Sequence, residues 1–268
     1  MSRKPVAIAM TLSDREALSA DEEISLRHLV RHLGHYDKFA VAPPTLATIP
    51  EGFTPKRFDR RFFGSAAAHC RLMLSEEFYS AFAEYDYILL YHLDALALGD
   101  RLAEWCASGY DYVGPPWLTC DDSPWVDRPR VGNGGFSLRR VDAFLRVLRG
   151  GRGSASFTGY WERRARQRPR LARLGVPVAK TMSYLTSARS HARRWPECNA
   201  RGNEDYFWSD EACRLDPAFR VAPFEAGLQF AFEVAPRLCF ELNGRQLPFG
   251  CHAWPRYDRE FWEPYLLS

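Results

Sequence analysis

Short apolar runs alternate with segments of helical periodicity in the first part of the chain. Residues 6–10 and 38–42 are apolar runs of strand length. Residues 19–34, between them, open with a Ser-x-x-Glu capping box and then repeat Leu and Val at intervals of three and four positions. A strand, a helix and a second strand within about forty residues form a βαβ unit, whose strands lie parallel in one sheet. The pattern therefore predicts an α/β fold.

The stretch Tyr87-Ile-Leu-Leu-Tyr-His-Leu-Asp94 predicts the centre of that sheet. Its first five residues are too few for an independent helix and too apolar for an exposed loop, so they predict a strand buried on both faces. The chain turns polar at His92 and Asp94, where we expect the strand to end. Ligands of open α/β sheets bind outside the carboxyl ends of the strands, so Asp94 is a candidate for holding a metal or a sugar-nucleotide. A polar cap at the strand end explains Asp94 equally well.

The remaining pattern is less regular. It predicts a strand that runs into a proline turn at 112–117, a polar loop at 118–130 and an amphipathic helix at 141–148. A long loop beside a ligand site is typical of a mobile lid. Residues 151–200 are rich in arginine and weakly patterned, and no element is predicted there.

The composition is typical of a soluble globular protein but says little about what the protein binds. A chain of 268 residues can bury the core of one large domain or of two closely packed lobes, and 46% hydrophobic with 26% charged residues is ordinary for a soluble protein. A net charge of +3 gives no reason to expect a nucleic-acid partner. Arginines nevertheless crowd residues 139–173, where Asp142 and Glu162 are the only acids. This segment is predicted to form a local patch for an anionic partner or for peripheral membrane contact.

The seven cysteines are scattered singly, with no CxxC pair. An odd number without paired spacing favours free thiols in a reducing compartment over a disulfide framework or a zinc site. The apolar run after the basic N-terminus is shorter than the core of a signal peptide, and no run approaches the ~20 residues needed to span a bilayer. We therefore expect a cytoplasmic protein.

Three further groups of residues could carry chemistry, and each has a simpler structural explanation. Gly132-Asn-Gly-Gly135 lets the backbone pass close to a ligand, although a tight turn between elements also explains the glycines, and the spacing is not that of a Rossmann or Walker loop. Asn203-Glu-Asp205 offers a carboxylate that could take a proton from an acceptor hydroxyl, although acids at a helix start also stabilise the helix. His252 could reach back as a metal ligand, although a lone histidine is more often a hydrogen-bonded structural residue.

Five short blocks, taken in order, resemble a family long catalogued only as a domain of unknown function, which is similar to GT-A glycosyltransferases. The blocks are Tyr87-Ile-Leu-Leu-Tyr-His-Leu-Asp94, Tyr110-Asp-Tyr-Val-Gly-Pro-Pro-Trp117, Val131-Gly-Asn-Gly-Gly-Phe-Ser-Leu-Arg139, Asn203-Glu-Asp205 and Pro248-Phe-Gly-Cys-His-Ala-Trp254. The resemblance covers most of the chain but not residues 151–200. It implies a GT-A-like (Rossmann-like) α/β fold, with a mostly parallel central sheet flanked by helices and a smaller acceptor-side region.

The same resemblance implies how the chain is divided. Residues 1–268 would form one GT-A-like domain, with a nucleotide-binding half at about residues 1–117. Residues 118–268 would form the acceptor-binding half and would carry an arginine-rich insertion near residues 150–200.

The resemblance implies a metal site as well. In GT-A enzymes a D-x-D motif ends a central strand and binds Mn²⁺ or Mg²⁺ together with the diphosphate of the donor. Asp94 matches the last position of that motif, and His92 stands where its first acid would be. Because histidine is a softer ligand and carries no negative charge, this departure leaves the dependence on metal open. His252 matches the C-terminal histidine that often completes the metal site in these enzymes.

Other residues of the chain match segments that contact the donor sugar and the acceptor in GT-A enzymes. Asn133, Gly134 and Gly135 resemble the segment that lines the donor sugar and the acceptor in GT-A enzymes. Glu204 or Asp205 lies where inverting enzymes of this fold place their catalytic base, and the sequence does not choose between the two.

We therefore expect a glycosyltransferase that moves a sugar from a nucleotide-sugar donor to a hydroxyl acceptor, such as an anionic glycan. Inversion assisted by Mn²⁺ or Mg²⁺ is the leading hypothesis. One alternative is a retaining transferase on the same fold, which needs no dedicated base. Others are a non-catalytic nucleotide-sugar or anionic-glycan binding module, suggested by the imperfect D-x-D, and a basic interaction protein that uses the arginine-rich segment.

Overall fold

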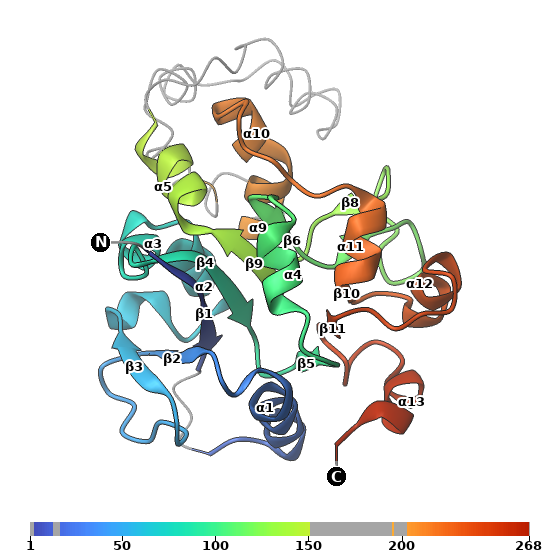
Figure 1. The fold of residues 1–268 in the computed structure, drawn as a ribbon, viewed down its shortest axis with the longest axis horizontal. Helices are drawn as coiled ribbons and strands as arrows, with labels where there is room; N and C mark the ends of the chain where they lie inside the picture. Colours follow the sequence, from blue (N-terminus) through green and yellow to red (C-terminus); the bar gives the residue numbers. More distant parts are fainter. Residues whose placement is uncertain (1–2, 13–16, 151–194, 196–202, 268) are drawn as a thin grey trace, which may run out of the picture.

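The computed structural model describes residues 3–12, 17–150, 195 and 203–267 (Figure 1). At its centre lies a six-stranded sheet in the order β3-β2-β1-β4-β9-β6, flanked by helices. The strands are β1 (Lys4–Thr11), β2 (Asp37–Ala42), β3 (Thr54–Arg57), β4 (Tyr85–Tyr91), β6 (Tyr112–Val113) and β9 (Phe136–Arg140). The predicted α/β class is confirmed.

The central sheet is mixed. Strands β3, β2, β1 and β4 are parallel, whereas β9 runs antiparallel to both β4 and β6. The expectation of a mostly parallel sheet was therefore wrong. The reason lies at the end of β4, where the N–H of His92 donates to the carbonyl oxygen of Gly135 (2.8 Å). Strand β9 consequently begins where β4 ends and runs back along it, whereas a parallel neighbour would first have to cross to the other end of the sheet.

The predicted βαβ unit and the predicted central strand are both present. Helix α1 (Ala20–Leu33) joins β1 to β2 and begins at the expected capping box. In that box the N–H of Ser19 donates to Glu22 Oε2 (2.7 Å) and the N–H of Glu22 donates to Ser19 Oγ (3.3 Å). The predicted central strand is β4, whose residues 88–91 have no exposed surface. These elements form as predicted because their signals are local in the sequence.

Helices cover both faces of the sheet (Figure 1). Besides α1 they are α2 (Ala66–Met73), α3 (Glu76–Ser80), α4 (Leu102–Ala107) and α5 (Val141–Arg149). Helices α1 and α4 lie on one face, where the Tyr91 hydroxyl donates to the carbonyl oxygen of Ser25 in α1 (2.8 Å). Helices α2, α3 and α5 lie on the other face, where Arg139 Nη1 donates to the Tyr79 hydroxyl of α3 (2.9 Å). The carboxyl end of β4 therefore emerges between two helical layers.

A second, smaller sheet lies beside the carboxyl end of β4. Its strands, in the order β10-β11-β5, are β10 (Ala231–Phe232), β11 (Gly250–Cys251) and β5 (Leu96–Ala97). Helices α12 (Pro236–Leu242) and α13 (Arg259–Trp262) pack with this sheet around the buried rings of Trp254 and Trp262. Because β5 comes only two positions after Asp94, this small sheet is fixed directly to the end of β4.

The other elements frame the same end of the sheet. The predicted strand at 112–117 is divided into β6 and β7, and β7 pairs with β8 across the loop predicted at 118–130. A helical segment begins at residue 204, within the acidic segment predicted to open a helix, and includes a π-helical turn at residues 207–211. The bounds are β7 (Pro116–Trp117), β8 (Arg130–Val131), α9 (Glu204–Tyr206), α10 (Ala212–Leu215) and α11 (Phe224–Phe230). Short 3-10 turns occupy Arg60–Phe62 and Glu263–Tyr265.

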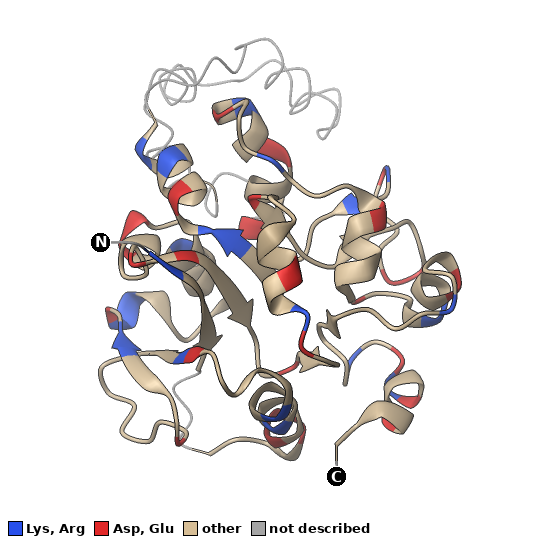
Figure 2. Ribbon diagram, viewed as in Figure 1, with Lys and Arg blue, Asp and Glu red and all other residues tan. Residues whose placement is uncertain are grey.

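Among the described helices none is long and apolar enough to cross a membrane. Basic and acidic positions are interspersed over the described ribbon (Figure 2). In the predicted basic patch, Arg146 pairs with Asp216 (2.6 Å) and Arg149 pairs with Glu76 (2.7 Å). Residues 151–173 of that patch lie outside the described residues. Six cysteines are free thiols, and Cys198 also lies outside the described residues.

Candidate functional site

Strand pairing in the small sheet brings His92, Asp94 and His252 together. His92 and Asp94 lie in the turn between β4 and β5. Strand β11, immediately before His252, pairs antiparallel with β5, and the N–H of Trp254 donates to the carbonyl oxygen of Asp94 (3.1 Å). These bonds hold His252, from near the end of the chain, beside the end of β4. The three residues singled out in the sequence thus form one cluster.

The cluster has the dimensions of a metal site. Each of the three residues offers a ligand atom, and these atoms all lie within 4.8 Å of one another. His252 Nε2 is 3.2 Å from Asp94 Oδ1, and His252 Nδ1 is 3.0 Å from Glu233 Oε1. The ring of His92 stands edge-on to that of His252, with centroids 5.4 Å apart, and its Nε2 is buried with no hydrogen-bond partner among the described residues.

The charges of this cluster depend on one another. Burial lowers the pKa of His252, but the adjacent carboxylates of Asp94 and Glu233 outweigh burial and raise this pKa to about 10. Burial raises the pKa of Asp94, but the charge of His252 outweighs it and holds the Asp94 pKa below its usual range. Burial lowers the pKa of His92 well below its usual range. The contacts place the His252 ring between the carboxyl groups of Asp94 and Glu233, beside the ring of His92.

The donor set fits a divalent cation of the first transition row. The buried, partnerless Nε2 atom of His92 is the observation that points to a ligand, because buried polar atoms are normally satisfied. Two imidazoles and one carboxylate suit a softer cation such as Mn²⁺ better than Mg²⁺, which prefers oxygen ligands throughout. Binding would replace the proton on His252 Nε2, since only the neutral imidazole is a ligand.

Glu204 is held in a buried ion pair with Arg139. The guanidinium has no exposed surface, and its Nη2 lies 2.9 Å from Glu204 Oε1. It also donates through Nη1 to the Tyr79 hydroxyl (2.9 Å) and through Nε to Ser137 Oγ (2.9 Å). This ion pair occupies the Glu204 carboxylate and ties the start of α9 to β9.

Asp205 differs sharply from its neighbour. Its side chain is buried, accepts a hydrogen bond from the N–H of Tyr206 (3.0 Å), and forms no salt bridge with any cation of the described residues. Burial raises its pKa well above the usual value, and the nearby charges of Glu204 and Glu233 raise it further. A carboxylate with raised proton affinity is what a general base needs. The structure therefore separates the two acids that the sequence left equivalent.

The glycines between β8 and β9 lie between the two clusters. A Cβ atom at Gly134 would lie 2.4 Å from Glu204 Oε1, and one at Gly135 would lie 2.0 Å from His252 Nε2. Both distances are far shorter than any real contact, so only glycine lets the backbone pass here. These glycines lie in an irregular connection between β8 and β9, which passes close to both His252 and Glu204.

Asn133 connects this turn to a residue that the sequence analysis did not select. Its Nδ2 donates to Glu233 Oε1 (2.6 Å), and its Oδ1 accepts from the N–H of Gly135 (2.8 Å). Glu233 is buried and follows β10 directly. The signal that could have found it resembles the one that singled out Asp94, an acid placed at or just after the end of an apolar strand.

The residues of this site fall in a segment of the chain that matches a known protein family. The family described as "Protein of unknown function (DUF5672)" matches residues 52–252, well over half of the chain. The chain belongs to the DUF5672 family. None of the curated proteins compared with the chain matches it. The DUF5672 match contains every site residue described above and ends at His252.

Beside this site, a cavity of about 190 Å³ opens at the carboxyl end of β1. His69, in α2, lines this cavity and lies within the segment matched by DUF5672. Its Nε2 is buried and has no hydrogen-bond partner among the described residues. The rings of His69 and His92 meet edge-on with centroids 4.9 Å apart. His69, His92 and His252 thus form a row of imidazoles from the cavity to Asp94. The cavity is lined by Thr11, Leu12, Phe62, Phe63, Gly64, Ser65, His69 and Leu72.

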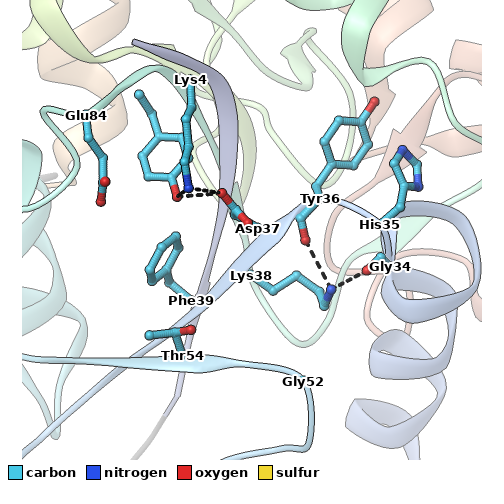
Figure 3. Close-up of a pocket in the computed structure, with 11 residues that line it drawn as sticks. Lys4, Gly34, His35, Tyr36, Asp37, Lys38, Phe39, Gly52, Thr54 and Glu84 are labelled. Atoms are coloured by element: carbon cyan, nitrogen blue, oxygen red, sulfur yellow. Dashed lines mark hydrogen bonds and ion pairs between the residues drawn. The ribbon is translucent and has the colours of Figure 1, made fainter. Parts of the chain in front are cut away.

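A larger hollow of about 380 Å³ lies at the opposite, amino ends of the strands (Figure 3). Lys4, Asp37 and Tyr85, which open β1, β2 and β4, line it and bond to one another. None of the site residues described above lines this hollow. The larger of the two hollows and the candidate site therefore lie at opposite ends of the sheet.

Proposed function

We propose that this chain is a metal-assisted glycosyltransferase of GT-A type, which transfers a sugar from a nucleotide-sugar donor to a hydroxyl acceptor with inversion. One observation carries the proposal: the His92–Asp94–His252 cluster and the raised-pKa carboxyl of Asp205 meet at the carboxyl end of one α/β sheet. The cluster could hold a cation against the departing diphosphate. Asp205 could accept the proton of the acceptor hydroxyl, which is the nucleophile. Ligands of α/β sheets bind at this end of the strands.

The donor side rests on the histidine cluster and the neighbouring cavity. Asp94, His92 and His252 would hold a divalent cation, which supplies positive charge to the departing diphosphate. The 190 Å³ cavity, with aromatic walls from Phe62 and Phe63, has room for the flat base of a nucleotide. The row of imidazoles joins this cavity to the cluster, so one donor could reach both.

The acceptor side rests on Asp205. As the acceptor oxygen forms its bond to the anomeric carbon, the bond from that carbon to the diphosphate oxygen breaks, and its electron pair leaves with the diphosphate. Asp205 takes the proton of the acceptor hydroxyl, which its raised pKa favours. Arg139 and Glu204 hold the start of α9 and so fix the position of Asp205.

The proposal is tested in two steps. The first is a thermal-shift panel of UDP-, GDP-, CMP- and dTDP-sugars with and without Mn²⁺, because a donor that binds only the folded chain must raise the melting temperature. We expect one nucleotide class to act, with a larger shift when Mn²⁺ is present and with that increment lost in Asp94→Asn. The second is transfer to a panel of hydroxyl acceptors by the wild type, Asp205→Asn and Glu204→Gln.

The variants and the product separate the alternatives. We expect Asp205→Asn to bind the donor but to lose transfer, and Glu204→Gln to lose stability. Full transfer by Asp205→Asn would refute the assignment of the base. Product with the same anomeric configuration as the donor would indicate a retaining enzyme. Donor binding with neither transfer nor donor hydrolysis would indicate a binding module.

A further inference from the structure

Glu233 occupies an unusual position for an acid. Its side chain is only 7% exposed, and its Oε1 receives two hydrogen bonds, from Asn133 Nδ2 (2.6 Å) and from His252 Nδ1 (3.0 Å). A buried carboxylate is costly unless hydrogen bonds and charge compensate it, and here His252 provides the charge. No step of the proposed reaction uses Glu233.

We propose that Glu233 is a positioning residue that fixes the tautomer and the orientation of His252, so that Nε2 is presented to Asp94 and to a divalent cation. A carboxylate that accepts from Nδ1 keeps the proton there and leaves Nε2 as the ligand atom. The observed contacts have this arrangement, with Nδ1 toward Glu233 and Nε2 3.2 Å from Asp94 Oδ1. The inference rests on the metal-assisted part of the proposed function.

Asn133 links Glu233 to the backbone of the glycine-rich segment. It accepts from the N–H of Gly135 through Oδ1 and donates to Glu233 through Nδ2, so one side chain fixes both the turn and the carboxylate. The turn in turn limits the histidine ring, since a Cβ at Gly135 would lie 2.0 Å from His252 Nε2. The ring of His252 is thus held by Glu233 from one side and by the backbone of Gly135 from another.

The test measures Mn²⁺ binding alone, followed by its electron paramagnetic resonance without donor or acceptor. Glu233→Met fills the space but removes the acceptor oxygen, whereas Glu233→Gln keeps an oxygen that can accept from Nδ1. We expect Glu233→Met to weaken Mn²⁺ binding about 10–100-fold, the usual effect of losing the carboxylate behind a histidine ligand, and Glu233→Gln to recover most of it. Glu241→Gln, an exposed acid of α12, is the matched control and should bind Mn²⁺ as the wild type does.

The wild type provides a test that needs no variant. With Zn²⁺ in place of paramagnetic Mn²⁺, ¹⁵N NMR of the imidazoles should show the proton of His252 on Nδ1. A proton on Nε2 would overturn the inference, and so would Mn²⁺ affinity in Glu233→Met equal to that of the wild type. Because no sugar is involved, a protein that binds Mn²⁺ in a Glu233-dependent way but transfers nothing contradicts the glycosyltransferase proposal alone.

Discussion

The two ends of the central sheet carry polar side chains of opposite character. At the amino ends of the strands, Asp37 accepts hydrogen bonds from Lys4 Nζ (2.9 Å) and from the Tyr85 hydroxyl (2.8 Å) (Figure 3). Asp37 and Lys4 are about half exposed, with 49% and 58% of their side chains accessible. The charges of this trio are matched and hydrated, as expected of groups that cap strand ends.

At the carboxyl ends the Asp94 side chain is about as exposed as Asp37, at 46%, but several of the other polar groups are buried and incompletely matched. His69 and His92 each bury an Nε2 that has no hydrogen-bond partner among the described residues. Asp205 is buried beside two other acids and forms no salt bridge within the described part of the chain. Such groups reduce stability, and natural proteins keep them chiefly where chemistry needs them.

The difference shows which observations distinguish the candidate site from the hollow at the amino ends. The larger hollow lies at the amino ends, yet Lys4, Asp37 and Tyr85 in its lining bond to one another without a ligand. The smaller cavity lies beside the partnerless imidazoles. The DUF5672 match begins at residue 52, so it leaves out Lys4 and Asp37 and includes the whole carboxyl-end cluster. Single partnerless buried atoms also occur elsewhere, for example at Tyr87 and Trp105, so the candidate site is marked by two adjacent partnerless imidazoles beside a cavity, and not by volume.

The largest expected effect comes from Asp205→Asn. If Asp205 is the base, transfer should fall about 10²–10⁴-fold, the usual contribution of general base catalysis. The free energy of unfolding of the variant should instead rise. Because the folded pKa of Asp205 is raised above its unfolded value of about 3.9, the wild type loses stability as pH rises above that value. The variant lacks this loss, so its free energy of unfolding should exceed that of the wild type at pH 8.

The measurements are initial rates of transfer and urea unfolding at pH 5 and pH 8. The advantage of Asp205→Asn should be larger at pH 8 than at pH 5. A variant that is less stable than the wild type at pH 8 would show that Asp205 is structural. The carboxyl end would then no longer differ from the amino end in the sense argued above.

Arg139→Met tests the buried Arg139–Glu204 ion pair at the carboxyl end. Removing the guanidinium leaves the Glu204 carboxylate buried and unpaired, which should lower the free energy of unfolding by about 3–5 kcal/mol. Replacing both partners, as in Arg139→Met with Glu204→Leu, should restore much of that loss. Urea unfolding measures both. Arg149→Met, which breaks an exposed pair, is the control and should cost at most about 1 kcal/mol.

If Arg139→Met proved as stable as its control, the pair would contribute no more than a surface contact. Glu204 would then have to be considered again as a base. The double variant distinguishes an unpaired buried charge from a loss of packing. A loss that persists when both partners are apolar would come from packing and not from the unpaired charge.

Gly135→Ala tests the close approach of the turn to His252. The new methyl group would overlap His252 Nε2, so either the ring or the turn must move. We expect Mn²⁺ affinity to fall about tenfold or more and the free energy of unfolding to fall by about 1–3 kcal/mol. Gly99→Ala is the matched control, because nothing lies within 4 Å of its added Cβ. Equal Mn²⁺ titrations of the two variants would contradict the proposed position of His252.

Local sequence signals predicted the elements of this fold better than their arrangement. The buried strand at 87–91 and the capping box of α1 were found because run length and spacing specify them within a few residues. The direction of β9 was not, because it depends on the pairing of His92 with Gly135, residues far apart in the chain. A mostly parallel sheet was the wrong inference from a correct βαβ unit.

The site shows the same limit. Asp94 was a candidate from its place after a strand, but its contact with His252 depends on the pairing of β5 with β11. Glu204 and Asp205 were equivalent in sequence because their difference is Arg139, a partner that only the fold supplies. Glu233 was overlooked because its strand is two residues long and gives a weak pattern.

The smallest expected effect is that of Asp37→Asn at the amino end. Hydrogen bonds from Lys4 and Tyr85 lower the pKa of Asp37, so its contribution to stability is present above the unfolded value of about 3.9 and is lost as pH falls below it. Since the pair is half exposed, the variant should lose at most about 1 kcal/mol at neutral pH, and less in high salt. Urea unfolding at two salt concentrations measures this loss. Mn²⁺ affinity and transfer should stay at wild-type levels, because Asp37 is at the far end of the strands from the histidine cluster. A tenfold change in either would connect the two ends of the sheet and would remove the distinction between a cap and a site.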